Sequence, residues 1–412
     1  MKMKTKVIGI GAAGNKAAIS LIEQSVINED NVMLLNSTLR DVPKQYTKLA
    51  KQIGNTANGS SGGCGKEREI AKELMLNSLQ NESIRLEGFL DPDDDMVIIV
   101  SSSEGGTGCG ASIVVAEYVS EVLGLNVSLF VFTGFEEDAR GLANTVEYFQ
   151  DLKSTYIIQA ISNKKFLDET GNKLRAEYEA NNAFVSKVKT IMGSYLLECE
   201  QNIDETDLRK IVTTPGFMIV ESAPINSKIK NVNMFNDLCS NLIDKSSSLE
   251  FNPTAKRIGV ILNVSEKTKD YIDYTFQVLK NKLGNPFEIY THIQSEGGDI
   301  EYIAVIASGI NLPLEDIQNI YNKYMQESAK VEKKRDSFFS KSKEFTKAEE
   351  DSIFDTVPKK KRSDMNAKHS FFTSRMNKNN SNNIAVIKQQ PVTPQDKAST
   401  VQILKEVDIK SV

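Results

Sequence analysis

Short apolar runs alternate with amphipathic stretches over the first 160 residues. The apolar runs are short and rich in Val, Ile and Leu, as expected of buried strands, and between them AAISLIEQ (17–24) and ASIVVAEYVSEVLG (111–124) have helical spacing. The predicted strands are KVIGI (6–10), NVMLLN (31–36), DMVIIVSSS (95–103) and VSLFVFTG (127–134). This alternation predicts a parallel sheet with helices on both faces.

A second α/β set follows a long helical pattern at 174–201, which contains no proline. Its predicted strands are GFMIVESA, KRIGVILNVS, PFEIYTHIQS and EYIAVIASGI, all before residue 311. A proline-marked start then opens a charged helix, and beyond it the chain is polar and without periodicity, as disordered segments are. The predicted organisation is therefore a nucleotide-binding domain at 1–173, a central helix at 174–201, a smaller α/β assembly domain at 202–310, a C-terminal helix at 311–345 and a flexible basic tail at 346–412.

Composition limits the chemistry. The chain has 412 residues, enough for two domains with substantial cores, and contains no apolar run long enough to cross a membrane. Its start enters a strand directly and does not have the pattern of a signal peptide, so we expect a cytoplasmic protein. Four scattered cysteines without CxxC spacing suggest reduced thiols, and two histidines nearly exclude His-based metal sites and triads.

Charge is unevenly distributed. Residues 357–412 contain 11 Lys/Arg and 4 Asp/Glu, a charge of +7, which leaves about −12 on the first 356 residues. The tail could bind DNA, an anionic membrane or an acidic subunit face, or it could act only to keep the protein soluble. An acidic body makes direct DNA binding by the body unfavourable.

Two glycine motifs fail when each is tested as a complete fingerprint. GIGAAG (9–14) fits GxGxxG between a strand and a helix, but the next strand ends at Asn36 and Ser37, without the carboxylate that would hold an NAD ribose. SSGGCGKE (60–67) resembles a P-loop, yet Ser60 replaces the first glycine and Glu67 the Ser/Thr that would hold magnesium.

Together, three glycine-rich loops favour a nucleotide. The loops at 9–14, 62–65 and 105–110 are each expected at the carboxyl end of the same parallel sheet, where open α/β sheets bind ligands. Two of them lead into helices whose free N–H groups suit phosphate. Several loops converging on one point suit a triphosphate better than a simple turn.

The motifs resemble the tubulin/FtsZ superfamily of filament-forming GTPases. EGGTGCG (104–110) is similar to the family's GGGTG(S/T)G phosphate signature, and GIGAAGN (9–15) to its first nucleotide loop; Glu104 and Cys109 depart from the signature. The resemblance spans residues 4–310 and implies GTP/GDP with Mg²⁺ on the phosphates. It implies that the nucleotide-binding residues are Gly11, Ala12, Ala13, Gly14, Asn15, Lys16, Asn36, Gly62, Gly63, Gly105, Gly106, Thr107, Gly108, Cys109, Gly110, Glu136, Arg140, Asn163, Tyr178 and Asn182.

The resemblance implies that the last residues of this set contact the guanine base and the ribose. Tyr178 and Asn182, four apart on one helix face, match a ring that stacks on guanine and an amide that reads its edge, and Asn163 matches a further guanine contact. Glu136 and Arg140 match a ribose and phosphate pair, although at this spacing they could equally form a surface ion pair.

Catalysis is implied at QNIDETDLRK (201–210). Asp204 and Asp207 at a helix start are ordinarily a cap and a first-turn acid. With Asn202 they match the family's NxDxxD loop, which reaches the nucleotide of the next subunit and polarises the attacking water. The resemblance therefore implies head-to-tail filaments with polymerisation-activated hydrolysis.

The chain ends favour one branch of the superfamily. No short apolar, proline-containing peptide of the division proteins ends the chain, and a long helix with a basic tail is most similar to the TubZ family of plasmid and phage partition proteins. That similarity implies a TubR-like adaptor bound to centromeric DNA, and a bacterial host or its phage. A division or phage DNA-positioning protein, a nicotinamide or flavin oxidoreductase, and a non-catalytic filament protein remain alternatives.

Overall fold

The computed structural model describes residues 3–54, 62–193, 202–225, 229, 231–265, 268, 270–294 and 301–345, with side chains to residue 330. Residues Met1–Ser342 make up one compact unit. Its strands are β1 Thr5–Ile10, β2 Val32–Asn36, β3 Ala50–Gln52, β4 Met96–Ser102, β5 Val127–Thr133, β6 Ile157–Ser162, β7 Gly216–Pro224, β8 Arg257–Asn263, β9 Glu288–Gln294 and β10 Tyr302–Ile310. Its main helices are α1 Gly11–Glu23, α2 Arg68–Gln80, α3 Thr107–Glu117, α4 Ala139–Gln150, α5 Asn163–Thr170, α6 Lys173–Ile191, α7 Glu205–Val212, α8 Val232–Asp244, α10 Ile272–Leu283 and α11 Leu314–Phe345.

One mixed sheet runs through the whole unit, in the order β3-β2-β1-β4-β5-β6-β7-β10-β8-β9. From β3 to β6 all pairs are parallel, which confirms the sequence prediction for the first 160 residues. The pairing of β6 with β7 is only two residues long, and β10 is antiparallel to both its neighbours. The predicted α/β class is confirmed, while the five-part division of the chain stays a prediction.

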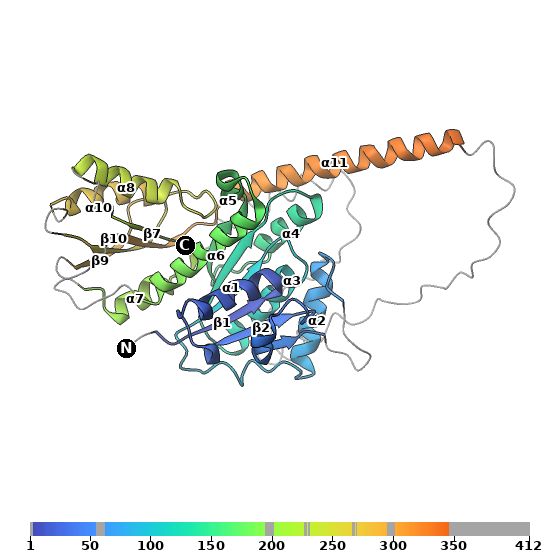
Figure 1. Cartoon of the computed structure of the whole chain (residues 1–412), viewed down its shortest axis with the longest axis horizontal. Helices are drawn as coiled ribbons and strands as arrows, with labels where there is room; N and C mark the ends of the chain where they lie inside the picture. Colours follow the sequence, from blue (N-terminus) through green and yellow to red (C-terminus); the bar gives the residue numbers. More distant parts are fainter. Residues whose placement is uncertain are drawn as a thin grey trace, which may run out of the picture. The chain divides into compact units, whose positions relative to one another are not determined.

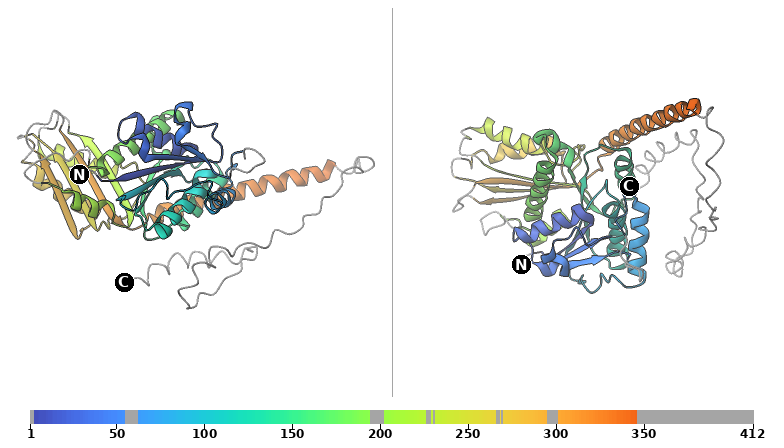
Figure 2. Two further views of the ribbon diagram at one scale, coloured as in Figure 1. Left: turned by 90° about the horizontal axis from the view of Figure 1, so that it is seen from below. Right: turned by 45° about the vertical axis from the view of Figure 1, so that its right-hand side comes forward.

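Helices cover both faces of the sheet (Figures 1 and 2). One core packs α2, α3, α8 and α10 against the sheet, and the other packs α1, α6 and α7 against its opposite face. Successive residues of β1 alternate between them, with Ile8 and Ile10 in the first core and Val7 in the second. This alternation follows from the period-2 geometry of a strand that is buried on both sides.

The structure differs from the predicted bounds of the central helix and agrees closely with those of the C-terminal helix. The central helix α6 ends at Ile191 and is followed by a turn, so part of the predicted span is not helical, and residues 194–201 of that prediction lie outside the described residues. The C-terminal helix α11 begins directly after Pro313 and ends at Phe345, close to the predicted bounds. The predicted tail at 346–412 lies outside the described part of the chain.

Candidate nucleotide site

The three glycine-rich loops meet at the carboxyl edge of the sheet. A Cβ built on Gly11 would lie 2.9 Å from the Gly108 nitrogen, so the loop after β1 lies against the loop after β4. A Cβ on Gly106 would lie 3.0 Å from the Cys64 side chain and 3.1 Å from Lys66 Cα, so the third loop touches the second. Gly11 also has φ +76, which an L-residue rarely adopts. The predicted convergence is therefore present as backbone contact.

Each loop feeds a helix that starts without a side-chain cap. The N-caps of α1, α2 and α3 are Ile10, Glu67 and Gly106, and none of these accepts a hydrogen bond through its side chain. By contrast, side chains cap the starts of α4 to α8. Uncapped helix starts leave N–H groups free, and these groups, with the positive end of the helix dipole, suit anions. Three such helices at one edge fit a polyphosphate.

Buried amides beside the loops carry unused hydrogen-bonding capacity. Asn15 is 3% exposed, and among the described residues neither its Oδ1 nor its Nδ2 has a partner. Asn36 uses its Oδ1 to accept from the Ser37 N–H, and its Nδ2 has no partner within the described chain. Ser37 Oγ lies 2.8 Å from Thr107 Oγ1, which links the end of β2 to the signature loop. Because buried polar groups are usually satisfied, the unpartnered amides fit a site completed by a polar ligand.

The remaining residues of the first loop are partly buried and partly on the surface. Gly14 is buried at the start of α1, whereas Ala12 and Ala13 are exposed on its first turn. Lys16 forms an ion pair with Glu177 of α6 at 3.2 Å, so its ammonium group faces a carboxylate. In the other two loops, none of the described residues comes within 4 Å of a Cβ built on Gly62, Gly63 or Gly105.

Asn144 of α4 joins two of these loops, and no sequence motif singled it out. Its buried Nδ2 donates to the carbonyl of Lys66 at 2.9 Å and to that of Glu104 at 3.1 Å, with Gly105 O at 3.4 Å. Asn at a core-facing helical position was the available signal, because a buried amide requires several partners.

The Cys109 side chain does not face the loops. It is fully buried in the core between α3 and the sheet, and its Sγ lies 3.4 Å from the carbonyl of Asn144. Burial raises the pKa of this thiol to about 12, so it remains protonated at neutral pH. At this position of the signature only the backbone can serve a ligand, and the same holds for buried Gly110.

Glu136 and Arg140 do not form the alternative i,i+4 ion pair. The Glu136 carboxylate contacts Lys323 of α11, while Arg140 Nη2 contacts Glu67, just after the second loop, at 2.6 Å. Arg140 Nε also donates to the Lys66 carbonyl at 3.3 Å. The Arg140 side chain therefore lies beside the second loop, whereas α11 holds the Glu136 carboxylate.

The proposed base-recognition residues lie on α5 and α6. Tyr178 is 63% exposed and Asn182 is half-buried one turn further along the same helix, and Asn163 is the first residue of α5. An exposed ring of this size is free to stack on a flat ligand.

The acidic cluster is tied to the opposite edge of the sheet. Asp204 is the N-cap of α7 and accepts from the Asp207 N–H at 2.8 Å, and Asn202 Oδ1 lies 2.8 Å from His292 Nδ1 of β9. Further along α7, Arg209 forms an ion pair at 2.8 Å with Asp95, which directly precedes β4. The glycine signature follows the carboxyl end of β4, so the length of this seven-residue strand, about 20 Å, separates α7 from the loops.

Comparison with known proteins shows which proteins this chain resembles. No family model matches the sequence. Over 312 residues the chain is 26% identical to the cell division protein FtsZ of Mycoplasmopsis pulmonis. The matched region covers 74% of this chain and 77% of that relative. The chain is thus similar in sequence to a member of the tubulin/FtsZ superfamily.

Solved structures share the superfamily fold. TubZ of Clostridium botulinum phage c-st superposes with a TM-score of 0.63 at 17% identity, covering 80% of this chain and all of that one. The GTPγS-form protofilament of TubZ from Bacillus thuringiensis serovar israelensis gives 0.67 at 14% identity, with 81% and 94% covered. CetZ2 of Haloferax volcanii, a GTPγS-bound protofilament, gives 0.65 at 17% identity, with 80% and 100% covered.

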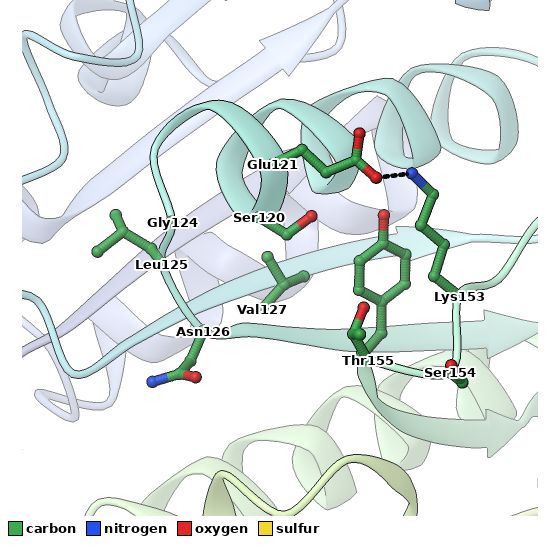
Figure 3. Close-up of a pocket in the computed structure, with 10 residues that line it drawn as sticks. Ser120, Glu121, Gly124, Leu125, Asn126, Val127, Lys153, Ser154 and Thr155 are labelled. Carbon is green, nitrogen blue, oxygen red and sulfur yellow. Dashed lines mark hydrogen bonds and ion pairs between the residues drawn. The ribbon is translucent and has the colours of Figure 1, made fainter. Parts of the chain in front are cut away.

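A separate pocket of about 610 Å³ lies at the amino edge of the same tubulin-like sheet (Figure 3). Val127 at the start of β5 and Tyr156 just before β6 line it. Lys153 at its rim is already paired with Glu121 and, at 3.0 Å, with Glu117. The pocket is distinct from the glycine loops.

Other expectations can be checked on the described residues. Cys64, Cys109 and Cys239 are free thiols there, and Cys199 lies outside them. No group of three or more His, Cys, Asp or Glu in this part of the chain is arranged to hold a metal ion. Within the same limits, no helix is long and apolar enough to cross a membrane.

Proposed function

We propose that this tubulin-like chain binds GTP at the three glycine loops, assembles head to tail and hydrolyses GTP at the interface between subunits. The observation that supports this most directly is the placement of the two functional groups. The glycine loops lie at the carboxyl edge of the sheet, and Arg209 ties the helix capped by Asp204 to the amino edge. A carboxylate at one edge cannot act on a phosphate at the other edge of the same chain, so a second copy has to bring them together.

The residues divide this work. The uncapped starts of α1 and α3 bind phosphate, Tyr178 and Asn182 select guanine, and Glu136 contacts ribose. Asp204 and Asp207 from the next subunit orient and polarise the attacking water, with Asn202 beside them. When bound, Mg²⁺ would neutralise part of the negative charge on the phosphates. Assembly and turnover are then coupled, because hydrolysis requires a neighbour.

The test is high-speed sedimentation with magnesium and GTP, ATP or no nucleotide, with phosphate release measured on the same samples. GTP-selective pelleting, and phosphate release per subunit that rises steeply with protein concentration, are expected. Turnover that does not depend on protein concentration would contradict an interfacial site. Absence of pelleting with every nucleotide would contradict filament assembly and reopen the oxidoreductase alternative.

We further propose that the filament moves plasmid or phage DNA through a TubR-like adaptor that binds the C-terminal helix or the +7 tail. Support comes from the long charged helix α11, from the basic composition of residues 357–412 and from the likeness to TubZ structures. A role in cell division is the second candidate, because the relative identified by sequence is a division protein.

Deleting residues 346–412 tests the role of the tail. GTP hydrolysis and pelleting are expected to remain within about twofold of the full chain, because the site lies elsewhere. Retention of adaptor-bound DNA on filaments is expected to be lost if the tail binds the adaptor and kept if helix α11 binds it. Co-sedimentation of labelled DNA with the adaptor measures this. Loss of hydrolysis in the truncated chain would show that the tail belongs to the assembly machinery.

A further inference from the structure

Glu104 occupies the first position of the glycine signature, and its side chain points away from the loop cluster. A Cβ on Gly134 would lie 1.8 Å from the Glu104 Cδ and Oε2 atoms, so the carboxylate occupies the volume that any side chain at 134 would need. A Cβ on Gly141 would lie 3.1 Å from the same Cδ. Two glycines, one after β5 and one in α4, thus make room for this carboxylate.

The carboxylate also binds the backbone of the loop between β5 and α4. Glu104 Oε1 accepts from the Glu136 N–H at 2.8 Å, and Glu136 has φ +59, an uncommon conformation for a residue other than glycine. We call Gly134, Gly141 and this N–H the Glu104 cradle. Since the Glu136 side chain projects from the same backbone, the bond fixes where that side chain starts.

The main chain of Glu104 is held as well. Its carbonyl accepts from Asn144 of α4 at 3.1 Å, and the Lys66 carbonyl accepts from the same amide. One residue of the signature therefore connects to α4 through its backbone and to the β5–α4 loop through its side chain. Replacing Glu104 by the glycine usual in the signature would leave the backbone contact and remove the side-chain contact.

We propose that Glu104 is a positioning residue of the nucleotide site, which holds the 134–138 loop against the phosphate signature and thereby sets the position of Glu136. The inference rests on the proposed nucleotide function. It assigns a role to a carboxylate that would otherwise repel phosphates, and it makes Gly134 and Gly141 dependent on residue 104.

The first test is a double-mutant cycle read without nucleotide. Gly134→Ala alone displaces the Glu104 carboxylate, and Glu104→Gly alone removes it. Both are expected to speed amide hydrogen exchange at 134–138 by about 10- to 100-fold, the loss of one hydrogen bond to a charged group. In Glu104→Gly/Gly134→Ala the alanine no longer meets the carboxylate, so it should add nothing to the effect of Glu104→Gly. Gly88→Ala, whose Cβ would meet only an ordinary 3.8 Å contact, is the control.

The second test separates positioning from general packing. Glu104→Gly is expected to raise KM for GTP about tenfold while kcat stays within about twofold, because the loop binds the nucleotide and does not carry the acids. Glu104→Gln keeps the shape and an acceptor oxygen and should restore most of the affinity. Glu117→Gln, on the surface of α3, controls for loss of a carboxylate.

The outcomes distinguish this proposal from the proposed function. Unchanged exchange at 134–138 in Glu104→Gly, or additive effects in the cycle, would overturn the positioning role even if the protein hydrolyses GTP. A fall in kcat as large as the rise in KM in Glu104→Gly, with no recovery in Glu104→Gln, would also overturn the positioning role. A wild-type chain that binds no guanine nucleotide would overturn the proposed function, while the exchange data would still report on the cradle.

Discussion

Asp204 carries two roles at the scale of a single residue, and its substitutions can separate them. As N-cap of α7 it accepts from the Asp207 N–H, and as a carboxylate it is the proposed catalytic group. Asn and Ser cap helices about as well as Asp, whereas Ala does not. A neutral capping residue therefore removes only the charge.

Asp204→Asn is expected to fold normally, to bind GDP as the wild type does, and to lose at least about 100-fold in phosphate release, the scale of a group that acts on the attacking water. Filaments should persist longer. Asn231→Ala, which removes the cap of α8, should cost about 1 kcal/mol of stability without changing kcat. Disassembly of Asp204→Asn filaments at the wild-type rate would exclude the carboxylate from hydrolysis.

The Glu104 carboxyl group has a pKa above its usual range. Burial, more than any other effect, raises the pKa of this carboxyl; the Glu136 N–H opposes it, and Asp138 and Lys66 act in opposite directions nearby. A raised folded-state pKa gives stability that is present at low pH and lost as pH rises through that pKa.

Glu104→Gln, neutral at every pH, should therefore melt above the wild type at pH 7–8, and the difference should shrink as pH falls toward 5. Thermal denaturation of both proteins across this range is the measurement. Because the two proteins differ only at residue 104, the difference between their melting temperatures reports on that side chain. A difference that grows on acidification would contradict the assignment.

At the scale of elements, α11 docks on α4 beside the nucleotide loops. Ile320 packs against Leu142 and Val146, with two tyrosines of α11 around them. One turn along, Lys323 contacts the Glu136 carboxylate, the group proposed to meet ribose. The C-terminal helix and the nucleotide thus share one carboxylate, which links the site to the part of the chain proposed to bind the adaptor.

Lys323→Ala is expected to raise GDP affinity by about two- to fivefold, because ribose no longer competes with an ion pair whose lysine is half-exposed and which is worth under about 1 kcal/mol. Fluorescent-nucleotide titration measures the change. Lys330→Ala removes a pair within α11 and should have no effect. Weaker nucleotide binding in Lys323→Ala would instead mean that Lys323 supports the site.

At the scale of the whole molecule, the separation of loops and acids across β4 makes hydrolysis a property of two chains. Asp204→Asn has intact loops, whereas Gly108→Val places a side chain against the Ile10 carbonyl and the Ser102 N–H and should abolish nucleotide binding. Neither variant should hydrolyse GTP alone.

Mixing the two is expected to restore about a quarter of wild-type turnover, the share of interfaces at which the loops of one variant meet the acids of the other when chains pair at random. Phosphate release across mixing ratios measures this. Circular dichroism of each variant checks folding. No recovery from two folded variants would contradict a site shared between subunits.

The sequence alone predicted eight of the ten strands of the sheet, the α/β class and the positions of the glycine loops, because strand and helix periodicity and glycine spacing are local properties of the chain; β3 and β6 were not predicted. The loops after β1 and β4 could be expected at one edge for the same reason, since parallel strands end together.

How side chains from distant segments share space becomes visible only in the folded chain. That Glu104 turns into the volume left by Gly134 and Gly141, that Asn144 joins two loops, and that α7 is tied to the opposite edge depend on contacts between residues 30 or more positions apart. No local periodicity encodes such contacts, because they arise from how the helices and strands pack.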